Sequence, residues 1–156
     1  MAKKIFETLA DLAACVGQDD LAVSDWVTIT QEQINLFAEA TGDHQWIHTD
    51  AQKALLGPFK TTIAHGFLTL SLIPMLSQEA IHINQSRMGI NYGLNKVRFT
   101  SPVPVGSRLR ARMKLLDNKS LEDGSGGVQQ TWEMKIEREG LDKPVCIAET
   151  LVRRYP

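Results

Sequence analysis

Asp43 and His48 are the residues whose types and spacing best suit proton transfer. His48 follows the aspartate by five positions, in a polar stretch that begins directly after Gly42. A carboxylate with a usual pKa of about 3.9 accepts protons at neutral pH, and an imidazole with a pKa of about 6.5 accepts or donates one. Together the two groups could hold and activate a water molecule. From spacing alone, a second interpretation stays open, in which the aspartate forms a turn and the histidine is an ordinary hydrogen-bonded loop residue.

A metal site is another interpretation of the clustered histidines. His44 and His48 have the spacing of the two histidines in H-E-x-x-H, and Asp50 and His65 could add oxygen and nitrogen ligands. Gln45 stands where that motif has its glutamate base, and the preceding glycine argues against one helix carrying both imidazoles. We therefore predict no metal and no other cofactor.

The tripeptide Ala64-His65-Gly66 opens a long apolar segment. The first N–H groups of a helix have no intrahelical partner and lie at the positive end of the helix dipole, where they can stabilise an oxyanion. His65 and Gly66 are therefore candidates for an oxyanion or substrate contact. The alternative is that Gly66 only permits close packing and that His65 is a buried, hydrogen-bonded residue.

The segment before Asp43 carries the clearest helix signals. Thr30 and Gln33 form a capping box, and Ile29 and Ile34 occupy the positions of a hydrophobic staple. Gly42 predicts the end of this helix, because glycine readily adopts the left-handed conformation found there. The candidate aspartate should thus be held at the end of a well-defined helix.

The elements on either side of this helix are less sharply marked. Residues 3–15 have the pattern of a short amphipathic helix, and 21–29 looks extended. We expect a loop over 43–49, then a shorter helix from near Asp50 to Gly57-Pro58. An apolar helix over about 66–80 follows, with large side chains on nearly all sides, which is typical of a buried helix.

The second half of the chain predicts strands. Apolar and polar residues alternate over 108–115 and again over 130–136, and 121–127 between them has the composition of a flexible hairpin connection. Residues 145–152 are apolar on both faces, like a central strand, and 97–103 marks a further strand. Helices followed by long strands indicate an α+β fold, in which a curved antiparallel sheet of five to six strands wraps the long central helix.

Composition limits the classes of function. The chain has 156 residues, so we expect a single domain over 1–156 with an N-terminal helical extension over 1–20. Seventeen Lys and Arg against eighteen Asp and Glu give a net charge of −1, which argues against a nucleic-acid partner. Arg108, Arg110 and Arg112 alternate along one strand, and we interpret them as a solvated face rather than a phosphate site.

Two further features bear on compartment. Cys15 and Cys146 have no metal-ligand or redox spacing, so free thiols in a cytoplasmic protein are expected. The N-terminus lacks the apolar run of a signal peptide, and the most apolar stretch, 63–76, is shorter than the roughly 20 residues of a membrane span. We therefore predict a cytoplasmic protein with no membrane partner.

The run from Phe37 to Asp50 together with 63–67 resembles the hydratase motif of the MaoC-like (R)-specific enoyl-CoA hydratases and dehydratases, which have the hotdog fold. The likeness rests on G-D-x-x-x-[I/L]-H-x-D with a downstream A-H-G and extends over roughly 22–155. Many members have Asn-Pro where this chain has Gln45-Trp46. That variant, together with 90–95, resembles the nodulation-protein-N-like branch.

This resemblance implies roles for the candidate residues. Asp43 would act as base on a water that attacks C3 of a trans-2-enoyl-CoA or related thioester, and His48 would orient the water and help deliver a proton to C2. The Gly66 N–H would hold the thioester oxygen, and Ser71 is the candidate for the polar helix residue that often assists in this family. The alternative for Ser71 is a hydroxyl bonded to its own helix backbone.

The resemblance also implies a homodimer or higher homo-oligomer and an acyl-CoA substrate. Two other functions stay open for the same fold. One is an acyl-CoA thioesterase, in which water attacks the thioester carbonyl and frees the thiol. The other is a non-catalytic module that binds acyl thioesters without turning them over.

Overall fold

The computed structural model describes residues 2–156, and its centre is a six-stranded sheet in which every paired strand is antiparallel. The order is β2-β6-β7-β8-β5, with β3 also paired to β6. The strands are β2 (Ala22–Val23), β3 (Val27–Thr28), β5 (Met88–Phe99), β6 (Arg108–Ser120), β7 (Val128–Arg138) and β8 (Cys146–Tyr155). The predicted α+β fold with five to six antiparallel strands is confirmed. The strand expected over 97–103 begins earlier and ends at Phe99.

The two faces of the sheet follow the alternation in the sequence. On β6, Leu109, Ala111, Met113 and Leu115 are buried in the core. The arginines between them lie on the other face, where Arg110 and Arg112 each contact Glu137 of β7 at 2.7 Å. The predicted arginine row is therefore a row of cross-strand ion pairs.

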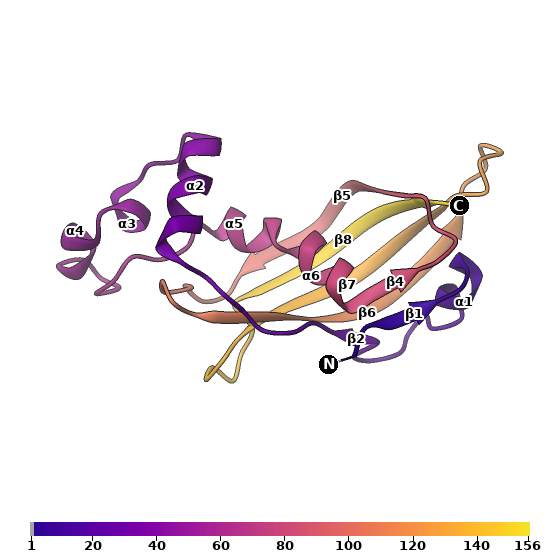
Figure 1. Ribbon diagram of the computed structural model, residues 1–156, viewed down its shortest axis with the longest axis horizontal. Helices are drawn as coiled ribbons and strands as arrows, with labels where there is room; N and C mark the ends of the chain where they lie inside the picture. The colour runs from indigo at the N-terminus through magenta and orange to yellow at the C-terminus, as the bar shows by residue number, and fades with distance from the viewer. Residues whose placement is uncertain (1) are drawn as a thin grey trace.

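The apolar segment after His65 forms two helices, α5 (Gly66–Ser71) and α6 (Ile73–Ala80), which lie over the sheet (Figure 1). The prediction of one helix over 66–80 is wrong at Leu72, because the ring of Pro74 lacks an N–H and clashes with the preceding turn. The prediction that this segment is buried on nearly all sides is also wrong. Phe67 is 68% exposed and Met75 is 38% exposed.

The N-terminal segment differs from the helix predicted over 3–15. Lys4–Phe6 forms β1, which pairs in parallel with β4 (Ile81–Ile83), and only Leu9–Ala13 forms a helix, α1. A Thr8–Asp11 capping box fixes where α1 begins. The strand depends on a partner far away in the chain, which local periodicity does not report.

Three helices project beyond one end of the sheet and form what we term the overhang, residues 30–57 (Figure 1). They are α2 (Gln31–Thr41), α3 (Trp46–Thr49) and α4 (Ala51–Leu55). The capping box of α2 is confirmed, and Gly42 ends the helix with a φ of 83°. The predicted loop over 43–49 is wrong in part, since Trp46–Thr49 forms one helical turn. Asp50 caps α4, as expected for a helix that begins there.

Across residues 2–156, no helix combines the length and apolar character that a membrane crossing requires.

Candidate active site

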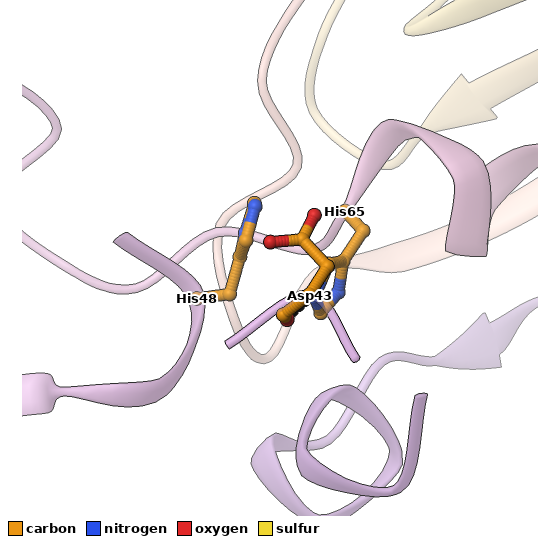
Figure 2. Close-up of side chains that lie close together, drawn as sticks. All are labelled: Asp43, His48 and His65. Carbon is orange, nitrogen blue, oxygen red and sulfur yellow. Dashed lines mark hydrogen bonds between the residues drawn. The ribbon is translucent and has the colours of Figure 1, made fainter. Parts of the chain in front are cut away.

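Asp43, His48 and His65 converge where the overhang meets the body of the molecule (Figure 2). One potential ligand atom from each side chain lies within 4.8 Å of the others. Asp43 follows the left-handed Gly42 at the end of α2, His48 lies in α3, and His65 directly precedes α5. The structure thus joins the predicted Asp43–His48 pair to His65, which is 22 positions away from the aspartate in sequence.

His48 is held in one tautomer. Its side chain is buried, and Nδ1 lies 2.7 Å from the carbonyl oxygen of Ile63. A carbonyl only accepts hydrogen bonds, so we assign the proton to Nδ1, which leaves Nε2 as a proton acceptor. Gln31 of α2 fixes the backbone of the same residue, because its Nε2 donates to the His48 carbonyl at 2.8 Å.

The pKa of His48 is lowered from its ordinary value. Burial is the main cause, because it disfavours the charged ring. The hydrogen bond to Ile63 acts in the opposite direction, nearby His65 lowers the pKa further, and Asp43 raises it. The net effect keeps the imidazole neutral near pH 7, in the form that accepts a proton.

His65 positions both members of the predicted pair. Its ring stacks on the His48 ring with centroids 3.9 Å apart, and its Nε2 donates to the backbone carbonyl of Asp43 at 2.9 Å. Phe37 also packs against the His65 ring, with ring centroids 4.9 Å apart. The Nδ1 atom of His65 is buried and has no hydrogen-bond partner among residues 2–156.

Gly66 lies beside this cluster at the first position of α5, where its N–H has no intrahelical acceptor. A side chain could not be added without movement, because a Cβ there would lie 2.9 Å from Cδ2 of Phe99. Together with His48 and Phe99, Gly66 lines a hollow of about 380 Å³. Gly66, the predicted N–H donor, and the imidazole of His48 therefore line the same hollow.

Ser71 is not part of this cluster. Its hydroxyl donates to the Phe67 carbonyl of its own helix at 2.6 Å, and its side chain lines a different cavity, between the helices and the sheet. Thr69 lines the hollow instead and is 2% exposed. Sequence reasoning missed Thr69, although its position one helical turn after Gly66 could have indicated it.

The residues of the metal interpretation do not come together as a set. His44 is exposed and contacts Glu39 at 3.7 Å, while Asp50 caps α4. The donor atoms that do converge are the Asp43 carboxylate and nitrogens of His48 and His65. One nitrogen of each imidazole is already engaged with a backbone carbonyl. The groups left over, Nε2 of His48 and the Asp43 carboxylate, are hydrogen-bond acceptors, which suits a water molecule donating both of its hydrogens.

Comparisons with known proteins agree on one family. The family model described as "MaoC like domain" matches residues 15–135. The 3-hydroxyacyl-thioester dehydratase Z of Mycobacterium tuberculosis (strain ATCC 25618 / H37Rv) is 55% identical over 150 residues, covering 96% of this chain and 97% of that protein. Nodulation protein N of Rhizobium leguminosarum bv. viciae is 43% identical over 143 residues, covering 90% of this chain and 87% of that protein.

Solved structures show the same architecture. An R-hydratase from Pseudomonas aeruginosa in its unliganded form has a TM-score of 0.67 and 28% identity, covering 88% of this chain and 79% of that one. A MaoC-like dehydratase from Rhodospirillum rubrum has a TM-score of 0.74 and 22% identity, covering 96% of this chain and 98% of that one. The resemblance predicted from the sequence is confirmed.

Proposed function

Because the chain belongs to the MaoC-like domain family and has its hotdog fold, we propose that it is a hydro-lyase that interconverts trans-2-enoyl thioesters and (R)-3-hydroxyacyl thioesters. The observation that carries the proposal is the position of the neutral His48 imidazole, which lies within a few ångströms of the Asp43 carboxylate and lines the same hollow as Gly66. These are the groups that addition of water to a polarised double bond requires.

In the hydration direction, Asp43 and Nε2 of His48 accept the two hydrogens of one water and aim its lone pair at C3. As the C–O bond forms, Asp43 takes a proton from the water and electron density moves to the thioester oxygen as an enolate. The Gly66 N–H donates to that oxygen. The proton then returns from the Asp43–His48 pair to C2 on the same face, which gives syn addition and balances the reaction.

We further propose that the chain acts as a homodimer joined through β5. This strand pairs only with β8 among residues 2–156, so one of its edges is free. Large apolar side chains along it are exposed, as are two on the neighbouring helices: Phe67, Met75, Met88, Ile90, Tyr92, Leu94 and Phe99. An exposed apolar patch next to a free strand edge is typical of a protein interface.

The proposal also includes the domain organisation of the chain and the compartment of the protein. We treat residues 1–156 as one MaoC-like domain, although residue 1 lies outside the described part. We place the protein in the cytoplasm, which is consistent with Cys15 and Cys146 being free of disulfide bonds. Burial raises the pKa of Cys146 to about 11, so this thiol stays protonated and unreactive.

The test is to follow loss of the enoyl chromophore with crotonyl-CoA and longer 2-enoyl-CoA esters. Asp43→Asn and His48→Ala should each lower kcat by about a hundredfold or more, because each removes a group that contacts the reacting water. Ser71→Ala is assayed beside these two variants, because Ser71 was a candidate residue and its hydroxyl lies outside the Asp43–His48–His65 cluster. Unchanged turnover in both the Asp43 and His48 variants would refute the site, and release of free thiol in place of hydration would support the thioesterase alternative.

A further inference from the structure

A second, larger cavity of about 490 Å³ lies between the helices and the sheet. Its walls come from α5 and α6 on one side and from β5, β7 and β8 on the other. It begins next to the candidate active site, since Thr69 lines the hollow there and Leu70, the next residue of α5, lines the cavity. This volume is within the usual range for a small-molecule site.

Most of the wall is apolar, but two hydroxyls of wall residues have no hydrogen-bond partner within the described part of the chain. Thr150 of β8 is 6% exposed, and its Oγ1 is buried without a hydrogen bond. Ser77 of α6 is on the opposite wall, and its Oγ is also buried and unpaired. A buried hydroxyl without a partner is costly, which suggests that a bound molecule supplies one.

Arg154 adds a positive charge to the same cavity. It lies four residues beyond Thr150 on the same face of β8, about 13 Å further along the strand. Register along β8 places it at the end remote from the active site, because Arg154 pairs with Gly89, while Cys146 pairs with Phe99 beside Gly66.

Among residues 2–156, the guanidinium of Arg154 has a neutral hydrogen-bond partner. Its Nε donates to Oε1 of Gln130 at 3.1 Å, and that oxygen also accepts from Trp132. No carboxylate among residues 2–156 forms an ion pair with it, and burial lowers its pKa. A half-buried arginine without a counterion among residues 2–156 is costly, and its planar donors match a carboxylate.

We propose that this cavity binds the acyl part of a thioester whose far end carries a carboxylate, which pairs with Arg154 while the chain lies against the apolar wall. The inference rests on the proposed hydro-lyase function and narrows its substrate class to ω-carboxyacyl thioesters. Thr150 and Ser77 donate to oxygens of the same ligand or to water that it holds. Arg154 is in this assignment a specificity residue, because it contacts the substrate far from the reacting carbons.

The direct test measures binding of saturated acyl-CoA esters, which cannot be hydrated. Matched pairs of equal chain length, one ending in a methyl group and the other in a carboxylate, are titrated calorimetrically into the full-length protein. The carboxylate-ended member should bind about tenfold to a hundredfold more tightly, the value of a charge-assisted hydrogen-bonded pair. Arg154→Met should abolish the preference, and Arg154→Lys should retain part of it.

Arg153→Met is the matched control. This neighbouring arginine alternates to the other face of β8, where it bonds to Gln129 at 3.1 Å and stacks over Tyr92. The Arg153→Met variant should leave the preference for the carboxylate-ended ester unchanged. If Arg154→Met does not fold, the preference of the unaltered protein and the Arg154→Lys variant still decide the matter.

Three results would overturn the inference. They are equal or tighter binding of the methyl-ended esters, failure of both esters to bind, and an equal loss for both esters in Arg154→Met, which would assign the arginine to the CoA part. The corresponding 2-enoyl-CoA pairs separate the inference from the function. Turnover without a preference refutes the inference alone, whereas a binding preference without turnover refutes the reaction alone.

Discussion

The close approach of Gly66 to Phe99 gives the sharpest prediction about the site. A Cβ at position 66 would lie 2.9 Å from Cδ2 of Phe99 and 3.0 Å from two further ring carbons, whereas ordinary contacts begin at 3.4 Å. Gly66→Ala must therefore separate the start of α5 from the ring by at least about 0.5 Å. Since a 1 Å displacement of a catalytic group can cost about a hundredfold in rate, we expect kcat/KM for enoyl-CoA hydration to fall about tenfold.

The same change should cost little stability. Phe99 lies outside the hydrophobic core, so its ring can shift without disturbing core packing, and we expect about 1 kcal/mol or less of the free energy of unfolding to be lost, at the low end for overpacking. Denaturant unfolding measures this, and hydration of crotonyl-CoA measures the rate. Replacing the ring in the double variant Gly66→Ala/Phe99→Leu should restore most of the activity. Full activity in Gly66→Ala, or no recovery in the double variant, would refute the reasoning that the ring limits the position of this N–H.

Two other predictions follow from the site and the free sheet edge. Because the pKa of His48 is lowered in the folded protein, its neutral form should be fully present above about pH 6.5, and both kcat/KM and the His48 contribution to stability should fall as the pH drops through the lowered pKa. The acid limb of the pH profile, measured beside the unfolding free energy of His48→Gln, checks this, and an acid limb centred above 6.5 would contradict it. Ile90→Lys, on β5 with an exposed side chain, should convert the proposed dimer to a monomer by burying charges at the interface. Sedimentation velocity measures the change, and an unaltered mass for this variant would argue against β5 as the interface.

Local chemistry explains which parts of the fold could be predicted. The capping box at Thr30 and the left-handed Gly42 act within a few residues, so the sequence around them was enough to place α2 and therefore Asp43. The alternation of apolar and polar residues is also a local pattern, and it was enough to predict β6 and β7. In contrast, the strand at Lys4–Phe6 depends on pairing with Ile81–Ile83, and the single turn at Trp46–Thr49 is too short to have a period.

The candidate site was predicted only in part for the same reason. The Asp43–His48 spacing was visible, but the ring stacking of His65 on His48 and its bond to the Asp43 carbonyl join distant segments. Ser71 was chosen by its place on the helix, and its hydroxyl is bonded to its own backbone. Pro74 was a local signal for the break at Leu72. The prediction of one continuous helix gave more weight to the run of apolar residues.

The overhang separates what the protein does from what keeps it folded. Asp43 and His48 lie in α3 and in the segment between α2 and α3. The extended hydrophobic core takes Ile34 and, at its margin, Phe37 from α2, and it draws chiefly on the sheet and on α6. Changes in the overhang can therefore alter the reaction at small cost to the core. Changes on the sheet face that lines the larger cavity can alter the proposed acyl contacts without moving Asp43 and His48. The fold thus leaves reaction and substrate choice free to diverge independently during evolution.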